Sequence, residues 1–345
     1  MNTNPSIAMI GAGAIGGITA AYMAAAGLDV ELVCKHEDTA AAANGEGLLI
    51  RGVRGEKRMR VRAVTEIEQL SAPKDIIMIA VKAYDMPDAA RRALPFLKPD
   101  GLAVSMQNGI CTDAMAAVVG PERTVGCVVG WGATMISRGA LDMTSEGEFI
   151  IGAIAPGMGE KLEALKRALS AFIETRISEG IVSELYSKMI VNSCITSMGV
   201  TSGLTLGEMM KRRLARNIFL GIIREAVAVA NAMKLTLPPY GGKLDYYKLA
   251  DGSSGFSRLR NHLLIRIVGI KYRRLKSSSL QSLQRGKPTE IDYFNGYIAQ
   301  KGAALGVPTP VNTTIVGIVK QIEAGKRKPD PGNFQDESII RALKG

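Results

Sequence analysis

A line of polar side chains runs along an otherwise apolar, helix-forming stretch at residues 181–203. Lys188, Asn192 and Thr196 are each four residues apart, so all three side chains leave one face of a helix. An amine, an amide and a hydroxyl are costly to bury unless they bind something. A lysine held beside hydrogen-bonding groups can also donate a proton to a reacting molecule. The line is therefore a candidate catalytic site, although a solvated polar face would show the same spacing.

A glycine pattern near the N-terminus fits a nucleotide-binding loop. A short apolar run at residues 6–10 is followed by GAGAIG and then by a stretch of small, helix-forming residues. In such a loop the first glycine permits a tight turn, the second lets the backbone approach a pyrophosphate, and the third lets the helix pack closely. Because strand, glycines and helix come in the required order, we expect a dinucleotide to bind at Gly11, Gly13, Ala14, Ile15 and Gly16.

The end of the second apolar run bears on the choice of cofactor. Residues 30–34 lead directly into Lys35, and no acidic residue follows until Glu37. Units that prefer NAD usually place Asp or Glu near this strand end to hold the ribose hydroxyls. A cation suits a 2′-phosphate instead, so the sequence favours NADP(H). A solvated lysine at a strand end is the alternative.

Two further polar residues follow buried strands. Apolar runs at residues 75–81 and 102–106 end close to Lys82 and Asn108. Strands that alternate with helical stretches predict a parallel sheet, whose ligands bind at the carboxyl ends of the strands. Both residues are thus candidates for the ligand site. Asn108 precedes a glycine, and an ordinary turn residue is the alternative there.

The strand pattern stops in the middle of the chain. Residues 47–64 predict an exposed hairpin, residues 124–129 and 141–155 predict more strands, and residues 160–172 predict an amphipathic helix. Helical periods dominate from about residue 181, with helices expected near 181–199, 207–234, 258–275, 289–305 and 311–324. We therefore expect an α/β domain over residues 1–175 and an all-α domain over residues 176–345.

The helix expected near 258–275 is strongly basic. Nucleic-acid binding is conceivable for such a helix. The arginine-rich hairpin at residues 47–64 has no interleaved aromatic residues for base stacking, so we expect a solvated face there and no nucleic-acid partner. The helix also has an apolar face, which we expect to pack against its own domain; this face consists of Leu259, Leu263, Leu264, Ile267 and Ile270.

A late stretch, KPTEIDYFN, contains a candidate acidic residue. Pro288 and Thr289 mark a helix start, and Asp292 stands three residues after the threonine in a capping arrangement. Glu290 would then lie in the first turn, where a helix N-terminus favours a carboxylate with or without a ligand. Upstream, the serines at 277–279 could hold a carboxylate or cap a helix.

Composition limits the class of protein. The 345 residues are 47% hydrophobic and 22% charged, and 43 basic minus 32 acidic residues gives a net charge of +11. A two-domain globular protein with anionic ligands fits these values. Four scattered cysteines and two histidines predict buried free thiols and no metal site. The uncharged first 28 residues lack both the basic start of a signal peptide and the composition of a membrane span, so we expect a cytoplasmic protein.

Five motifs, taken together and in order, resemble the ketopantoate reductase family over about residues 7–300. They are GAGAIG, VKAYD, QNG, ELYSKMIVNSCIT and the late SSSLQ with GKPTEIDYFNG. The resemblance implies a Rossmann-type doubly wound sheet, an all-helical C-terminal domain and an active site between them. It also implies NADPH-dependent reduction of ketopantoate to pantoate, a step toward pantothenate and coenzyme A.

The resemblance assigns roles residue by residue. Lys188 matches the catalytic lysine, and Glu290 matches a glutamate that contacts the substrate or the lysine. For the substrate the other matches are Asn192, Ser278 and Asn108. For the cofactor they are Lys82, Asn108 and Glu290 near the nicotinamide and Lys35 at the 2′-phosphate.

Two positions depart from the family pattern. Thr196, which we also place at the substrate, stands where a second asparagine is common, and Ser282 stands where an aspartate is usual. The 2-oxo acid is therefore open. The alternatives are a related reductase for another 2-oxo acid, or a non-enzymatic protein that senses NADP or binds nucleic acid. The long helical domain is compatible with a homodimer.

Overall fold

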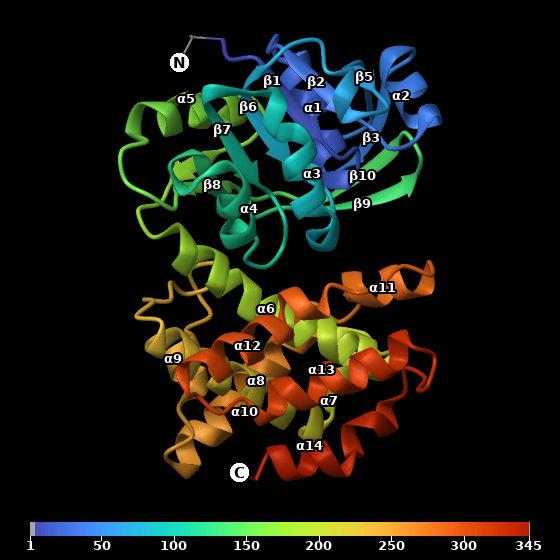
Figure 1. Cartoon of the computed structure of the whole chain (residues 1–345). Coiled ribbons are helices and arrows are strands. Elements are labelled where there is room, and N and C mark those ends of the chain that lie inside the picture. The colour runs from blue at the N-terminus through green and yellow to red at the C-terminus, as the bar shows by residue number, and fades with distance from the viewer. Residues whose placement is uncertain (1–3, 345) are drawn as a thin grey trace. The chain divides into compact units, whose positions relative to one another are not determined.

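The computed structural model describes residues 4–344, which form two compact units that divide after Leu185 (Figure 1). The division lies beyond the boundary expected after residue 175. β12 (Thr175–Ile177) pairs with β11 (Phe149–Ala153), which keeps it in the first unit. The start of α6 (Ile181–Ser202) also packs there, since a Cβ on Gly126 would lie 2.8 Å from the Ile181 side chain.

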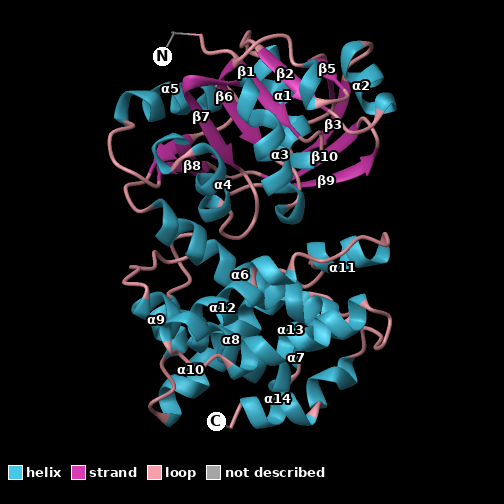
Figure 2. Cartoon of the chain, in the orientation of Figure 1, coloured by secondary structure: helices cyan, strands magenta, loops and turns pink. Residues whose placement is uncertain are grey.

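The first unit is built on an eight-stranded sheet, which confirms the expected α/β class. Its strand order is β12-β11-β8-β7-β6-β1-β2-β5, and its pairs are parallel except β11 with β8. The remaining strands are β1 (Ile7–Ile10), β2 (Val30–Val33), β5 (Arg62–Val64), β6 (Lys74–Ile79), β7 (Leu97–Ser105) and β8 (Thr124–Val129). The helices that cross over between them are α1 (Ala14–Ala25), α2 (Glu37–Asn44), α3 (Met86–Ala93), α4 (Thr112–Val119) and α5 (Gly159–Ser170) (Figure 2).

A second sheet of four strands covers α1. The hairpin expected over residues 47–64 is present as β3 (Leu48–Gly52) and β4 (Lys57–Met59), but β10 (Ala140–Ser145) and β9 (Gly132–Ser137) extend it. The hairpin is therefore part of a sheet rather than a free ribbon. Its contact with α1 is close, because a Cβ on Gly17 would lie 2.7 Å from the Leu141 side chain.

Aromatic rings and thiols fill the core of the first unit. Trp131 lies edge-on to Phe172 and Phe149, with ring centroids 5.3 and 6.0 Å apart, and Tyr22 stacks on Phe172 at 4.6 Å. All four cysteines of the chain are buried and form no disulfide, as predicted. Burial raises the pKa of the Cys34 thiol to about 12.

The second unit is helical, as predicted, but its helices are shorter and more numerous. They are α6, α7 (Leu206–Lys211), α8 (Arg213–Ala232), α9 (Tyr246–Ala250), α10 (Gly255–Lys271), α11 (Ser278–Gln284), α12 (Asn295–Leu305), α13 (Pro310–Glu323) and α14 (Glu337–Ala342). The helix expected at 207–234 is broken because Arg212 has extended backbone angles. Within residues 4–344, no helix combines the length and the apolar character that crossing a membrane requires.

The basic helix α10 contradicts the packing we expected for it. The apolar side chains Leu259, Leu263, Leu264, Ile267 and Ile270 are all exposed. The buried residues of α10 are instead Ser257, Asn261, Ile265 and Gly269. The reason is a close approach of α7: a Cβ on Gly269 would lie 2.4 Å from the Met210 Cβ. The absence of a side chain at Gly269 lets this face, which also holds Ile265, pack against α7, and the leucines of α10 therefore point outward.

A buried ion pair holds the amino end of the main sheet. Glu31 in β2 and Lys74 at the start of β6 are 2.8 Å apart, and their side chains are 1% and 4% exposed. The backbone N–H and the hydroxyl of Ser71 also donate to Glu31, at 3.2 and 2.9 Å. Burial alone would raise the pKa of Glu31, but hydrogen bonds from Lys74 and Ser71 hold that pKa below its ordinary value.

Glu31→Gln should lower the free energy of unfolding of the first unit by about 3–5 kcal/mol, because it leaves the Lys74 ammonium buried without a counter-charge. The stabilisation is fully present above the ordinary glutamate pKa of about 4.3 and is lost as pH falls through the lowered pKa. Urea unfolding followed by the fluorescence of Trp131, the single tryptophan, measures it. The free energies of unfolding of wild type and Glu31→Gln should become equal at acid pH. As a control, Glu46→Gln alters an exposed pair with Arg58 and should change the free energy of unfolding little. A Glu31→Gln protein as stable as wild type at neutral pH would contradict the prediction.

Candidate active site

The three glycines of the N-terminal loop meet three different constraints. Gly11 has φ +109°, and a Cβ there would lie 3.0 Å from the Ala80 carbonyl carbon. A Cβ on Gly16 would lie 2.0 Å from the Gly11 oxygen. By contrast, nothing lies within 4 Å of a Cβ built on Gly13. The packing of the loop explains the first and third glycines, and the open space at the second suits the approach of a ligand.

The loop leads into the N-terminus of α1. Gly13 is the N-cap residue and offers no side chain to the first turn, which contains no acidic residue. Ala14 and Ile15 are partly exposed there. The first amides of a helix have no partner within the helix and carry partial positive charge. The loop and the helix end therefore form a place where phosphate oxygens can accept hydrogen bonds.

Lys35 lies beyond the carboxyl end of β2 and is exposed. The acid within β2, Glu31, faces the other end of the sheet and is held by Lys74. Asp38, in the first turn of α2, pairs with Arg138 at 3.0 Å. The strand end where a ribose-binding carboxylate would stand thus presents a cation.

Gln107 connects the ends of β6 and β7, a role that the sequence indicated only by a polar residue after a buried strand. Its Nε2 donates to the carbonyl oxygens of Ile79 and Val81 at 2.7 and 3.2 Å, and its Oε1 accepts from the Ser105 hydroxyl at 2.7 Å. Lys82 follows one of these carbonyls directly. The carboxamide therefore fixes the backbone from which Lys82 extends.

Lys82 and Asn108 occupy the strand ends that we expected. Both are half-buried; Lys82 precedes a short 3-10 turn, and Asn108 precedes Gly109, which has φ +89°. Both of the readings offered for Asn108, a turn residue and a ligand-facing residue, are compatible with this position. A role at the cofactor stays a prediction for both residues.

On α6, Lys188 and Asn192 share a half-buried face of the helix, as the spacing predicted. Thr196 differs, because it is 5% exposed and its hydroxyl donates to the Asn192 carbonyl oxygen at 2.5 Å. That proton is used within the helix. Thr196 can still accept a hydrogen bond, but it is not the freely available donor that the sequence suggested.

The Nδ2 atom of Asn192 is the unusual group on this face. It is buried and has no hydrogen-bond partner within residues 4–344. An unsatisfied buried donor costs about 1–3 kcal/mol. A carbonyl or carboxylate oxygen from a ligand would satisfy it, one helical turn from the Lys188 amine.

Two buried tyrosines fix the helix around Lys188. The Tyr186 hydroxyl donates to the Ala226 carbonyl at 3.0 Å, and the Tyr246 hydroxyl donates to the carbonyl of Ser187. Burial raises the pKa of both phenols, so they remain protonated donors. Ser187 also donates to the Pro238 carbonyl at 2.9 Å. The segment immediately before Lys188 is therefore well anchored.

Glu290 is 5% exposed and stands just before a 3-10 turn, Ile291–Tyr293. The capping arrangement expected here is wrong: Asp292 pairs with Lys320, and the Thr289 hydroxyl donates to Glu323 at 2.6 Å. The α-helix consequently begins only at Asn295. α12 meets α6 where the Tyr297 and Tyr186 rings lie edge to face at 6.4 Å.

The three serines at the start of α11 are not equivalent. Ser277 is the N-cap and accepts from the Leu280 N–H at 3.0 Å. It also packs on α6, where a Cβ on Gly199 would lie 2.6 Å from its hydroxyl oxygen. Ser279 is buried, and Ser278 is the exposed member. Its predicted contact with a substrate carboxylate stays a prediction.

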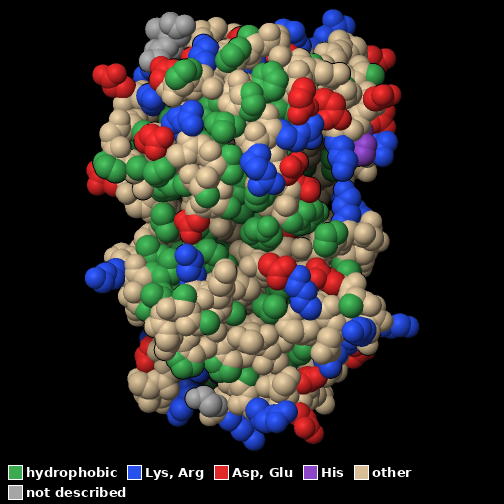
Figure 3. Space-filling model, in the orientation of Figure 1, with side chains coloured by type: hydrophobic (Ala, Val, Ile, Leu, Met, Phe, Trp, Pro, Cys, Tyr) green, Lys and Arg blue, Asp and Glu red, His purple; other side chains and the backbone are tan. Residues whose placement is uncertain are grey.

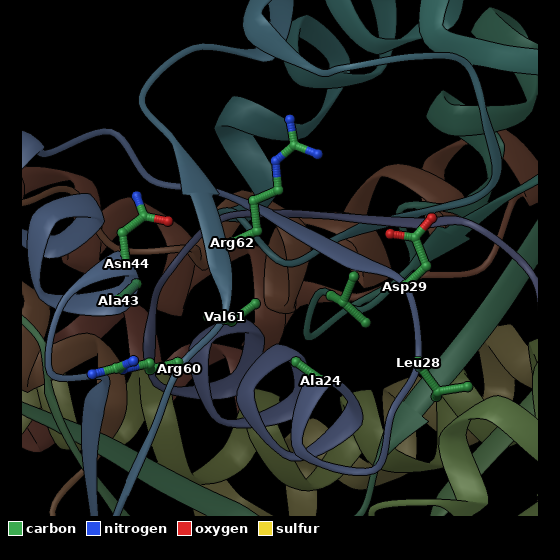
Figure 4. Close-up of a pocket in the computed structure, with 9 residues that line it drawn as sticks. Ala24, Leu28, Asp29, Ala43, Asn44, Arg60, Val61 and Arg62 are labelled. Carbon is green, nitrogen blue, oxygen red and sulfur yellow. The ribbon is translucent and has the colours of Figure 1, made fainter.

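A surface hollow of about 330 Å³ lies away from all of these residues (Figure 4). Asp29 and Arg62 line it, at the amino ends of β2 and β5. The glycine loop follows the carboxyl end of β1, which is parallel to β2, so the hollow lies at the opposite end of the sheet. Arg60 and Arg62 point in different directions in Figure 4 and do not converge on a ligand. We therefore leave it out of the candidate site.

The chemistry available to the two units is complementary. The first unit offers a phosphate-binding loop with a cation at the next strand end, and the second offers an amine and an unsatisfied amide on one helix face. On the surface shown in Figure 3, basic and acidic side chains are interspersed in both units rather than gathered in a basic strip.

Comparisons with known proteins agree with this arrangement. The family models "Ketopantoate reductase PanE/ApbA" and "Ketopantoate reductase PanE/ApbA C terminal" match residues 7–156 and 181–323. The chain is 30% identical to a 2-dehydropantoate 2-reductase of Pyrococcus abyssi over 92% of its length and 98% of that protein. It is 26% identical to that of Mesorhizobium japonicum over 92% and 97%.

Solved structures agree as well. A PanE/ApbA family ketopantoate reductase from Ralstonia eutropha has a TM-score of 0.79 and 25% identity, covering 93% of this chain and 99% of that one. A D-mandelate dehydrogenase solved with NADH and anilino(oxo)acetate has the same TM-score and coverage at 21% identity, a likeness of fold. The motifs, both units and both family models lead to one conclusion: the chain belongs to the ketopantoate reductase family and is an oxidoreductase that acts on CH–OH groups.

Proposed function

We propose that this protein reduces a 2-oxo acid to a 2-hydroxy acid with NADPH, and that the substrate is 2-dehydropantoate. The product would be pantoate, a precursor of pantothenate and coenzyme A. The names of the relatives support the substrate, and Lys35 at the end of β2 supports the phosphorylated cofactor. A cytoplasmic location follows from the same proposal, since the cofactor and the product are metabolites of that compartment.

The observation that carries the proposal is the unsatisfied Nδ2 of Asn192, one turn from Lys188. A 2-oxo acid presents a keto oxygen and a carboxylate on adjacent carbons, and both are hydrogen-bond acceptors. Asn192 can donate to one of these oxygens, and Lys188 can reach the keto oxygen. A donor that is buried without a partner is well prepared to bind an acceptor that arrives later.

A dinucleotide held by Gly11, Gly13 and Gly16 would supply the hydride for the keto carbon. Lys188 donates a proton from Nζ to the keto oxygen as that oxygen gains negative charge, so that hydride and proton together convert C=O to CH–OH. Asn192 holds the substrate by its Nδ2–H. Glu290 positions the lysine or the substrate, and Ser278 and Thr196 offer oxygen atoms to the substrate. Asn108 and Lys82 lie at the carboxyl ends of the strands, where we place the nicotinamide.

A reductase for a different 2-oxo acid is the second candidate. Thr196 favours it, since its hydroxyl is committed to the Asn192 carbonyl where the family commonly has an amide. Ser282 favours it too, as the usual aspartate is missing. Opine-like products belong to the same candidate. NADPH oxidation measured with 2-dehydropantoate and a panel that includes the 2-oxo acid of mandelate separates the two candidates by kcat/KM.

Lys188→Ala should reduce kcat by about 10²–10⁴-fold, because it removes the proton donor. The dissociation constant for NADPH should stay the same, since Lys188 lies on the helical unit and not on the glycine loop. Steady-state kinetics and cofactor titration measure the two quantities. Lys211→Ala, an exposed lysine on α7, is the control. Unchanged turnover in Lys188→Ala would overturn the proposed mechanism.

Lys35→Ala should reduce the preference for NADPH over NADH. Loss of a charged hydrogen bond to the 2′-phosphate costs about 1.5–3 kcal/mol, so NADPH affinity should fall by roughly tenfold or more while NADH affinity stays constant. Fluorescence titration with both cofactors measures this. Equal losses of affinity for NADPH and NADH would show that Lys35 does not bind the 2′-phosphate. The assignment as a reductase would be unaffected by that result.

Gly13→Ala and Gly16→Ala should fail in different ways. Gly13 has open space around a new Cβ, so Gly13→Ala should fold normally but bind the cofactor roughly tenfold or more weakly, because the methyl group occupies the pyrophosphate approach. Gly16→Ala places a Cβ 2.0 Å from the Gly11 oxygen, so thermal stability itself should fall. Thermal melts and cofactor titration separate the effects. Normal binding by Gly13→Ala would place the dinucleotide elsewhere.

A further inference from the structure

α10 turns its apolar side away from the helical unit. The residues on this outer stripe and their exposed fractions are Phe256 76%, Leu259 70%, Leu263 57%, Ile267 52% and Ile270 65%. Leu264, Tyr272 and Leu275 beside the stripe are also more than 40% exposed. A helix that presents its large apolar residues to water lacks a covering partner.

The inner contacts of α10 fix this orientation. Gly269 lies against Met210 of α7, with no room for a side chain. Asn261 is buried, and its Nδ2 donates to the carbonyl oxygens of Leu249 and Asp251 at 3.0 and 2.7 Å. Rotating the helix to bury its leucines would break both contacts. The outward stripe is therefore a fixed property of the unit.

The spacing of the stripe is symmetric. Its five residues follow one another at intervals of three, four, four and three, so Leu263 is the midpoint. When a second α10 lies antiparallel across a two-fold axis at Leu263, each Phe256 faces an Ile270 and each Leu259 faces an Ile267. A self-complementary patch of this kind is what an isologous dimer requires.

The area of the patch suits a stable dimer. With about 150–250 Å² for each large side chain, the eight exposed residues from Phe256 to Leu275 present on the order of 800 Å². A standard interface buries about 800 Å² on each partner, whereas the largest apolar patch of a monomer is typically about 300–600 Å².

The charges around the stripe affect how it associates. No acidic residue lies between Asp251 and Glu290, so the basic flanks of two copies repel one another. A helix that lies on an anionic membrane uses such cations to grip the surface. Here, however, the Arg260 guanidinium turns toward the fold, where it donates to the Lys248 carbonyl at 2.7 Å and to Asn261. The symmetry and the area favour a second copy of this chain.

We propose that the outer stripe of α10 is the interface of a homodimer, with Leu263 at its two-fold axis. This interface is independent of the proposed reaction. Because screening weakens the repulsion between the basic flanks, association should strengthen as salt rises. Binding to an acidic surface would instead weaken.

Leu263→Arg tests the interface, since it sets two guanidinium groups against each other at the axis. Light scattering during gel filtration should give wild type about twice the chain mass of 36.7 kDa and the variant a single mass. Leu305→Arg makes the same change at a leucine that is 44% exposed outside the stripe, and it should remain dimeric. A monomeric wild type, or a dimeric Leu263→Arg protein, overturns the proposal.

Leu263→Cys provides a second measurement that does not depend on disruption. The four native cysteines are buried, so a mild oxidant should act on the new thiol and link two chains. Leu305→Cys should not cross-link. Equal cross-linking of both variants, or none at position 263, counts against the interface. So does a wild type that stays monomeric but binds phosphatidylglycerol vesicles.

Discussion

The polar side chains of a buried helix need hydrogen-bond partners. In α6, the side chains that find no partner within the helix are the ones available to bind a ligand. The hydroxyls of Thr196, Ser197, Thr201 and Ser202 each donate to the carbonyl four residues earlier. These bonds satisfy four of the buried hydroxyls of the helix, whereas the buried Ser193 hydroxyl has no partner within residues 4–344. Asn192 has no such local partner for its amide, so its donor is left for something outside the helix. The candidate site exists because the Asn192 amide, on the face that also carries Lys188, is not satisfied within the helix.

The features that local spacing determines could be predicted from the sequence. The glycine loop, the parallel sheet, the shared face of Lys188 and Asn192 and the buried thiols all depend on period or on residue type. Features that depend on tertiary neighbours could not. The Thr196 hydroxyl bond, the bridging role of Gln107 and the reversal of α10 each need knowledge of what lies opposite. In α10 the sequence pattern was read correctly as amphipathic, but the close approach of α7 decided which side is inside.

The two units offer different kinds of ligand-binding group, because one is built on a sheet and the other on helices. A sheet with a glycine loop at its carboxyl edge offers fixed backbone donors, which suit a charged and extended cofactor. A helical unit offers side chains at set angles, which suit the recognition of a small acid. The positions where this chain departs from its family, Thr196 and Ser282, both lie in the second unit. Any change of substrate would therefore be expected to leave the cofactor half unaltered.

The edges of the main sheet have a consequence for the chain during synthesis and storage. Both edge strands, β5 and β12, are three residues long, and each contains an arginine, Arg62 or Arg176, that is held by a carboxylate. Short, charged edges are poor templates for another strand, and they discourage sheet-to-sheet aggregation. The main sheet is thereby protected against growth by strand addition, whereas the six-residue strand β9 forms an edge of the second sheet.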